Sequence, residues 1–204
     1  MNQRGRPLHA AVGHAIDLYR LARYEVFHPH SYSKFRMIKG MQRRTRATML
    51  IETGTFRGVT TRRCVPLFER IYTIEIQADL ARAARAYLAS FPHVTVIGGD
   101  ATQEVPRLLA DGRVRDALIF LDGHFSGGGT GRGASVEPAI DILELLGRHL
   151  GSIRGVIVDD FREFGVQEGW PKKWELIRTA EELFVPAGFR LGIHLDQLLL
   201  ERGR

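Results

Sequence analysis

TMLIETGTFRG, residues 48–58, joins a short apolar run to a glycine-rich turn that opens a helical pattern. Four similar runs follow along the chain: RIYTIEI (70–76), VTVIGGD (94–100), DALIFLDG (116–123) and RGVIVDD (154–160). Helical patterns separate them, over residues 58–68, 78–90, 102–110 and 136–150. Strands that alternate with helices in this way predict a doubly wound, mostly parallel α/β sheet.

Both ends of the chain add to this core. After a helical pattern over 171–184, GFRLGIHLDQLLLER (188–202) reads as two strands joined by a turn near residues 195–197. This predicts a Rossmann-like sheet of seven strands with an antiparallel C-terminal edge. Helical patterns over Leu8–Phe27 and residues 33–44 predict an N-terminal helical extension, 1–46, ahead of a domain over 47–204.

The charge of +6 is concentrated in the extension, because residues 1–50 hold ten Lys or Arg against Asp17 and Glu25. A basic arm of this kind suggests a nucleic-acid or anionic partner. The favoured interpretation is a solvated, arginine-rich helix face, because the stretch lacks interleaved aromatic clusters that could stack on bases. The apolar stripe over 8–27 could equally serve a partner helix, so a homo-oligomer is possible.

Cysteine usage and hydropathy bear on the compartment. Cys64 is the single cysteine, which excludes an intramolecular disulfide and a cysteine-based zinc cluster. No apolar stretch approaches the length of a membrane span or a signal-peptide core. We therefore expect a cytoplasmic protein with no membrane partner.

Acidic residues stand at or just after the carboxyl ends of the five predicted strands. In doubly wound sheets ligands bind beyond these ends, near the point where the strand order reverses. A single acid at such a position can be a helix cap or a solvated loop residue. Six carboxylates on one rim would repel each other, so their presence together predicts a functional site. The six are Glu52, Glu75, Asp100, Asp122, Asp159 and Asp160.

The first half of this rim is typical of an adenosine site. Gly54 permits a tight turn after the first strand and Gly58 permits close packing. Glu75, at the end of the second strand, is suited to bind both ribose hydroxyls, and Asp100 to meet an adenine amino group. Phe56 replaces the second glycine of the dinucleotide motif, which argues against a dinucleotide.

The segment LDGHFSGGGTGRG, residues 121–133, is rich in glycine but is not a phosphate-binding loop. Aligned on Gly128, the phosphate-loop pattern has Ala134 where its lysine must stand. The chemistry is therefore expected from Asp122 and His124, and we predict that residues 127–133 form a mobile flap over the acceptor.

Taken together, ETGTFRG, Glu75, GGDA (98–101), FLDGH (120–124) and VDDF (158–161) resemble class I S-adenosylmethionine-dependent methyltransferases, from about residue 33 onward. The chain is similar, more narrowly, to metal-dependent O-methyltransferases of macrolide and aminocoumarin sugars, and to a little-characterised bacterial group with an LDGHxSGG segment. The resemblance implies that Glu52 and Gly54 lie near the methionine moiety, Glu75 on the ribose and Asp100 near adenine. The predicted cofactor site also includes Thr55, Gly58, Gly99, Ala101 and Asp122.

The same resemblance implies that Asp122, Asp159 and Asp160 bind a divalent cation. His124 takes the position of the catalytic base, where the sugar O-methyltransferases have an aspartate. Mg²⁺ held by carboxylates lowers the pKa of a bound hydroxyl, and an imidazole can accept the proton near neutral pH.

We therefore expect a Mg-assisted O-methyltransferase acting on a small hydroxylated acceptor such as a sugar or natural product. An RNA methyltransferase guided by the basic extension is one alternative. A non-catalytic S-adenosylmethionine-binding or scaffold domain is the other.

Overall fold

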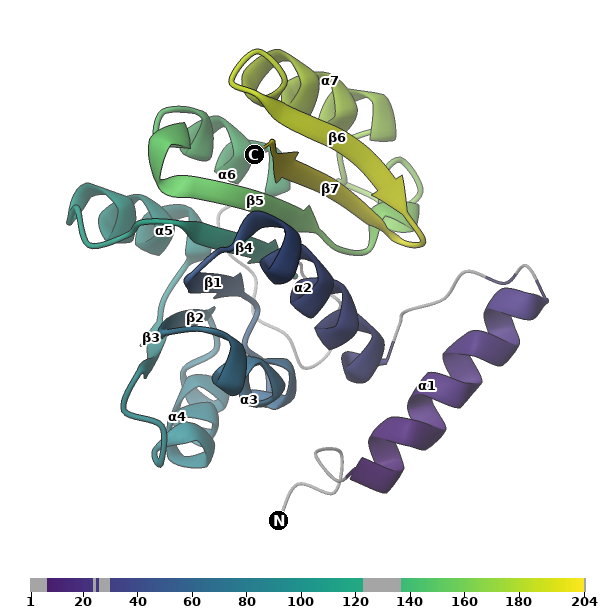
Figure 1. Cartoon of the computed structure of the whole chain (residues 1–204), viewed down its shortest axis with the longest axis vertical. Coiled ribbons are helices and arrows are strands. Elements are labelled where there is room, and N and C mark those ends of the chain that lie inside the picture. The colour runs from purple at the N-terminus through teal and green to yellow at the C-terminus, as the bar shows by residue number, and fades with distance from the viewer. Residues whose placement is uncertain (1–6, 24, 26–29, 123–136, 204) are drawn as a thin grey trace.

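A seven-stranded sheet forms the centre of the computed structural model, which describes residues 7–23, 25, 30–122 and 137–203 (Figure 1). The strands are β1 (Met49–Thr53), β2 (Arg70–Glu75), β3 (Val94–Gly98), β4 (Ala117–Leu121), β5 (Ile153–Val158), β6 (Phe189–His194) and β7 (Gln197–Arg202). Their order is β3-β2-β1-β4-β5-β7-β6, and β7 runs antiparallel to both of its neighbours. The predicted doubly wound sheet with an antiparallel C-terminal edge is confirmed.

The helices connect the strands and cover both faces of the sheet. They are α1 (Pro7–Ala22), α2 (Ser31–Thr45), α3 (Val59–Cys64), α4 (Ala78–Leu88), α5 (Ala101–Ala110), α6 (Ala139–Gly147) and α7 (Lys173–Phe184). The first helix ends at Ala22, short of the predicted Phe27. None of the helices in the described ranges is both long and apolar enough to cross a membrane.

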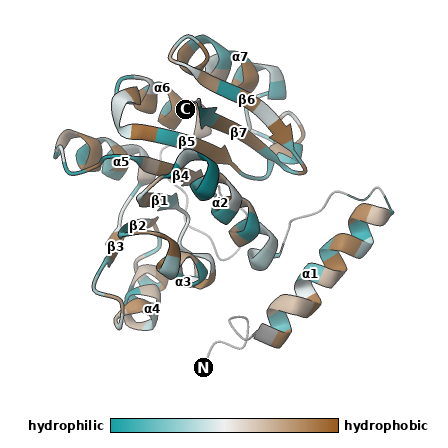
Figure 2. Ribbon diagram, viewed as in Figure 1, coloured by the Kyte–Doolittle hydropathy of each residue, from teal (hydrophilic) through white to brown (hydrophobic). Residues whose placement is uncertain are grey.

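Successive side chains of a strand point to opposite faces, so each central strand feeds two cores. In β1, Leu50 packs with α2 and α3, whereas Ile51 packs with α5, α6 and α7. In β4, Phe120 lies on the first face and Ile119 on the second. Burial on both faces explains why these strands read as continuous apolar runs, as Figure 2 shows by their brown colour.

The two helices of the predicted N-terminal extension differ in how they are held. In α2, Ile38 and Met41 are fully buried in the core on the β1–β4–β5 side. In contrast, α1 projects from the body of the molecule and contacts α2 (Figure 1). Its Leu8 and Tyr19 side chains are 78% and 62% exposed.

The strand order reverses between β1 and β4, which are neighbours although two strands separate them in the sequence. The parallel register sets Thr53 opposite both Ile74 and Leu121, and Leu121 opposite Val158. The loops that follow β1, β4 and β5 therefore leave the sheet side by side. This is the edge at which doubly wound folds bind ligands.

Candidate active site

The loop after β1 is a chain of tight turns tied to the end of β2. Gly54, Phe56 and Gly58 all have left-handed backbones, with φ of 81°, 48° and 70°. The N–H groups of Gly54 and Thr55 donate to the carbonyl of Ile74, at 2.9 and 3.1 Å. A Cβ at residue 58 would lie 3.2 Å from Cδ1 of Leu88, so both backbone and packing favour glycine there.

Glu75 is buried and accepts two backbone N–H groups. Its Oε2 accepts from Phe56 at 2.7 Å and its Oε1 from Gln77 at 2.9 Å. A carboxylate oxygen has a second lone pair, so this arrangement fixes the group in place and leaves it capacity to accept from a ligand. Glu75 is thus held in one orientation at the carboxyl end of β2.

Asp100 caps helix α5, of which Ala101 is the first residue. Its Oδ1 accepts from the N–H and the hydroxyl of Thr102, at 2.9 and 2.7 Å. The N–H of Gly99 donates to the carbonyl of Glu75 at 3.0 Å, and a Cβ at residue 99 would lie 2.9 Å from Cγ of Glu104. Asp100 therefore has the structural role of a cap, and its contact with adenine stays a prediction.

Glu52 lies behind the β1 loop, inside the protein. Its Oε2 accepts from the hydroxyls of Thr61 and of Thr73, the latter at 2.8 Å. Burial raises the pKa of Glu52 to about 7, although the two hydroxyls and Lys34 act in the opposite direction. The carboxyl group faces α3 and β2, and its predicted contact with methionine remains untested.

A cavity of about 470 Å³ opens at the reversal of strand order. The β1 loop forms one wall through Gly54, Thr55 and Phe56, and Asp122 lies at the end of β4. The start of α3 and the N-terminal segment also line the cavity, the latter through residues that include His30 and Lys34. The cavity thus combines the turn predicted for the methionine end of the cofactor with the predicted catalytic aspartate.

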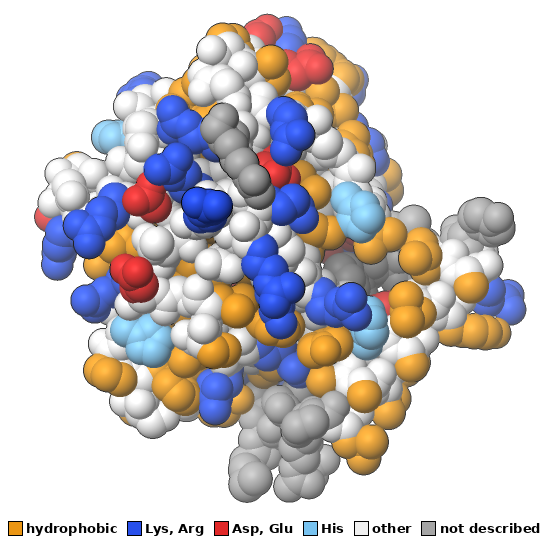
Figure 3. Space-filling model, viewed as in Figure 1, with side chains coloured by type: hydrophobic (Ala, Val, Ile, Leu, Met, Phe, Trp, Pro, Cys, Tyr) orange, Lys and Arg blue, Asp and Glu red, His pale blue; other side chains and the backbone are white. Residues whose placement is uncertain are grey.

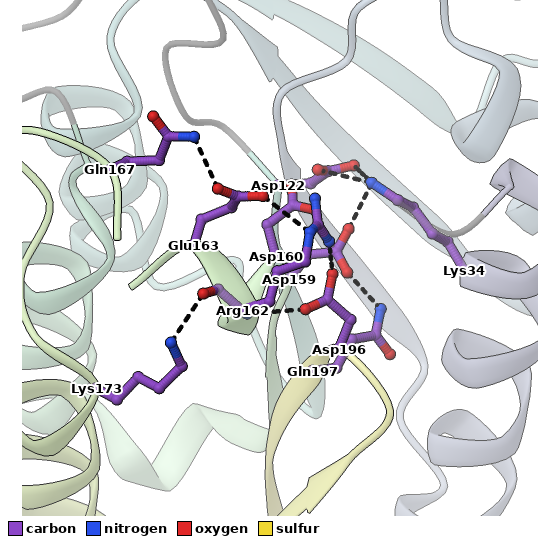
Figure 4. Close-up of polar contacts among 10 residues, drawn as sticks. All are labelled: Lys34, Asp122, Asp159, Asp160, Arg162, Glu163, Gln167, Lys173, Asp196 and Gln197. Carbon is purple, nitrogen blue, oxygen red and sulfur yellow. Dashed lines mark hydrogen bonds and ion pairs between the residues drawn. The ribbon is translucent and has the colours of Figure 1, made fainter. Parts of the chain in front are cut away.

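Asp122, Asp159 and Asp160 come together beside this cavity. One carboxylate oxygen from each lies within 4.8 Å of the others (Figure 4). The N–H of Asp122 donates to the carbonyl of Thr53, and that of Asp159 to the carbonyl of Leu121. These bonds hold Asp122 and Asp159 at the ends of neighbouring strands, and Asp160 follows Asp159 directly. We call the three aspartates the acidic cluster.

Lys34 enters the acidic cluster from helix α2. Its Nζ lies 2.9 Å from both carboxylate oxygens of Asp122 and 2.5 Å from Oδ2 of Asp159 (Figure 4). Burial opposes the charge on the ammonium, but the three aspartates outweigh it and raise the pKa of Lys34 above its ordinary value. Lys34 is therefore a fixed cation in the cluster.

Two further side chains orient the aspartates. Nε2 of Gln197 donates to Oδ1 of Asp159 at 2.8 Å. Nη1 of Arg162 lies 3.1 Å from Oδ1 of Asp160, and the same guanidinium forms ion pairs with Asp196 and Glu163. Asp160 has a left-handed backbone, with φ of 53°. The cluster is thus held by contacts from α2, the β5–α7 loop and the start of β7.

The residues of the acidic cluster fit a hard divalent cation by type, because carboxylate oxygens are the usual ligands of Mg²⁺. Their oxygens also approach one another closely enough to share one ion. However, the ammonium of Lys34 already stands against two of the three carboxylates. The three carboxylates are therefore suitable ligands for Mg²⁺, but the position between them is occupied by the ammonium of Lys34.

Comparisons with known proteins identify the fold. No protein-family model matches the sequence, and no curated protein matches it. Among solved structures, the chain is similar to an O-methyltransferase from Bacillus cereus in complex with SAH, with a TM-score of 0.62, 16% identity, and 94% and 98% of the two chains covered. The chain has the class I S-adenosylmethionine-dependent methyltransferase fold.

Two other similar solved structures are also methyltransferases. One is the O-methyltransferase TomG from Streptomyces achromogenes in complex with SAM, with a TM-score of 0.59, 19% identity, and 95% and 99% of the chains covered. Another is a SAH-bound methyltransferase from Podospora anserina, with a TM-score of 0.59, 12% identity, and 84% and 78% covered. At these identities the likeness establishes the fold.

The predicted site residues are therefore distributed in three ways. Asp122, Asp159 and Asp160 meet in one cluster, whereas Glu75 and Asp100 follow along the same edge of the sheet. His124 and the glycine run 127–133 lie outside the described residues. Lys34 was missed by the sequence-based reading, and its one signal is rarity, since it is one of four lysines among 29 cationic residues.

Proposed function

We propose that the protein is an S-adenosylmethionine-dependent O-methyltransferase that acts on a small hydroxylated acceptor. The observation that carries this proposal is the acidic cluster at the reversal of strand order, against a cavity walled by the β1 loop. The cofactor supplies an electrophilic methyl group on a sulfonium. We propose that the acceptor hydroxyl is oriented and deprotonated beside this cluster.

For the cofactor, we assign Glu75 to the ribose hydroxyls, because its carboxylate is already fixed by two backbone N–H groups and retains lone pairs. Asp100 and the start of α5 are assigned to the adenine end. Gly54 and Thr55 line the cavity and are assigned to the methionine end. We assign Glu52 a positioning role, since its hydrogen bonds hold α3 and β2 behind the loop.

For the acceptor, we propose a second cavity of about 550 Å³ between α1, α2 and the β6–β7 turn. Apolar side chains from all three elements line it together with Arg and His, which suits a molecule with both apolar and polar parts. Lys34 lines both cavities. An acceptor seated here would meet the methyl donor beside the acidic cluster.

Methyl transfer to oxygen is an in-line displacement, so most of the rate enhancement comes from positioning. The acidic cluster and Lys34 would hold the hydroxyl, and His124 is proposed to accept its proton. In place of the Lys34 ammonium, Asp122, Asp159 and Asp160 would hold Mg²⁺, which when bound lowers the pKa of the hydroxyl.

Cofactor binding tests the proposal most directly. We expect Glu75→Gln to weaken S-adenosylmethionine binding by about 10- to 100-fold, since hydrogen bonds to a charged group contribute about 1.5–3 kcal/mol. Isothermal titration calorimetry would measure this, and thermal unfolding would show that the variant folds. Glu144→Gln, an exposed acid on α6, is the matched control and should bind like wild type.

Two outcomes would count against the proposal. If the wild-type protein does not bind S-adenosylmethionine, the proposed function is wrong as a whole. If it binds the cofactor but transfers no methyl group to any member of a panel of sugars, phenols and hydroxylated natural products, a binding or scaffold role is favoured.

A further inference from the structure

We infer that Lys34 is the resident cation of the acidic cluster, and that a divalent metal ion binds there only by displacing it. The inference deepens the proposed function in one respect, since it names what controls access to the cluster. The geometry that supports it is independent of which acceptor is methylated. Three observations carry it.

The first observation is the position of the ammonium. Nζ of Lys34 contacts both oxygens of Asp122 and Oδ2 of Asp159, so it stands at the point those two carboxylates share. Mg²⁺ binds carboxylate oxygens at about 2.0–2.1 Å and would need the same point. Two cations at one position repel strongly in a buried site, so the arrangements exclude each other.

The second observation is a buried carboxylate oxygen of Asp159 that faces the ammonium of Lys34. Oδ1 of Asp159 accepts from Gln197, whereas the buried Oδ2 has no hydrogen-bond partner of good geometry among the described residues. What faces Oδ2 is the ammonium of Lys34, at 2.5 Å. Gln197 thus turns Asp159 so that its second oxygen points at the position of the cation (Figure 4).

The third observation is the way α2 aims Lys34. Lys34, Ile38 and Met41 are spaced i, i+4 and i+7, which places them on one face of the helix. Ile38 and Met41 are fully buried against the sheet. Because Lys34 lies on the same face of α2, its side chain is directed to the carboxyl edge of the sheet. A cation in the first turn of a helix is disfavoured by the helix dipole, and the acidic cluster offsets that cost.

The consequence is that removing the ammonium should create a metal site. We expect Lys34→Met, which keeps the aliphatic stem, to bind Mn²⁺ at least tenfold more tightly than wild type. Calorimetric titration of the full chain with MnCl₂ would measure this in the absence of cofactor and acceptor. Lys39→Met removes a lysine from the same helix away from the cluster and should behave like wild type.

A stability measurement accompanies the titration, because Lys34→Met leaves buried carboxylates without their cation. We expect its unfolding temperature to fall in EDTA and to rise on adding Mn²⁺, while that of wild type responds much less. Equal Mn²⁺ affinity in wild type and Lys34→Met would overturn the inference. The absence of Mn²⁺ binding in a folded Lys34→Met variant would overturn it as well.

The wild-type protein offers a second test should Lys34→Met not fold. Reductive methylation followed by peptide mass spectrometry reports the accessibility of each lysine amine. When Mn²⁺ is added in excess and binds to the protein, we expect the labelling of Lys34 to increase relative to that of Lys39. Binding of Mn²⁺ with no change at Lys34 would contradict the inference, whereas failure of S-adenosylmethionine binding bears only on the proposed function.

Discussion

Single carboxyl groups at the edge of the sheet have different partners and therefore different properties. Glu52 is enclosed and accepts from two hydroxyl groups of the described residues, and burial dominates its ionisation. Glu75 is held by two backbone N–H groups. Asp122 and Asp159 meet an ammonium. These acidic residues thus have three different roles: a structural acid, a candidate ligand-binding acid and a cluster that is paired with a lysine.

The raised pKa of Glu52 predicts a pH-dependent stability. The folded state favours the protonated form, so this contribution is complete below pH 4.5 and is lost as the pH rises through about 7. Glu52→Gln imitates the protonated form and should be more stable than wild type at pH 8, by at most about 3 kcal/mol. The gain should shrink toward pH 5. Urea unfolding at both pH values would measure it.

The control for this prediction is Glu69→Gln, because Glu69 is an exposed glutamate. Its effect on stability should be small and similar at pH 5 and pH 8. A difference between Glu52→Gln and wild type that does not change with pH would show that Glu52 is ionised in the folded protein at both values.

At the scale of elements, the start of α2 depends on α1. Oδ2 of Asp17 accepts from the N–H of His30 and the hydroxyl of Ser33, both at 2.7 Å. The first turn of α2 has no acidic residue of its own, so Asp17 supplies the negative charge that a helix N-terminus favours. Because Lys34 lies in that turn, the Asp17 contacts also hold the element that aims the ammonium.

We expect Asp17→Ala to loosen α1 from α2, because it removes two hydrogen bonds to a charged acceptor, each contributing about 1.5–3 kcal/mol. Trypsin should then cleave faster after Arg20 and Arg23 than in wild type, as followed by mass spectrometry. Asp79→Ala, which removes an exposed acid of α4, should leave the cleavage rate unchanged. Equal rates in Asp17→Ala and wild type would show that other contacts hold α1.

At the scale of the whole molecule, cationic side chains are prominent on the face that carries α2 (Figures 1 and 3). The chain has a net charge of +6, so it should attract polyanions at low ionic strength whatever its substrate. The proposed acceptor cavity, by contrast, is local and largely apolar at its walls. The salt dependence of binding therefore distinguishes general electrostatic attraction of a polyanion from specific recognition of an acceptor.

We expect RNA binding to be weak and to fall steeply between 50 and 200 mM NaCl, by about 10³-fold or more if six phosphates are contacted. Fluorescence anisotropy with a labelled RNA would follow the affinity, and a radiolabelled methyl donor would follow transfer. Methyl incorporation into RNA that persists at the higher salt concentration would favour the RNA methyltransferase over the small-acceptor enzyme.

The sheet and most of its acidic edge could be predicted from local patterns in the sequence. Apolar runs that alternate with helical patterns are local signals, and a parallel sheet with both faces covered follows from them. The acids at the ends of β4 and β5 could be predicted to meet, because neighbouring parallel strands end at the same edge. His124 was a sequence prediction that stays open, since it lies outside the described residues.

The cation that lies among those acids could not be predicted from local patterns, because it comes from a distant helix. Lys34 and Asp122 are 88 residues apart, and no periodicity links a helix of the N-terminal segment to a strand end at that distance. Their contact exists because Ile38 and Met41 bury one face of α2 against the sheet, which fixes where the preceding turn points. Packing between distant elements, and not local pattern, placed a cation where the sequence predicted a metal.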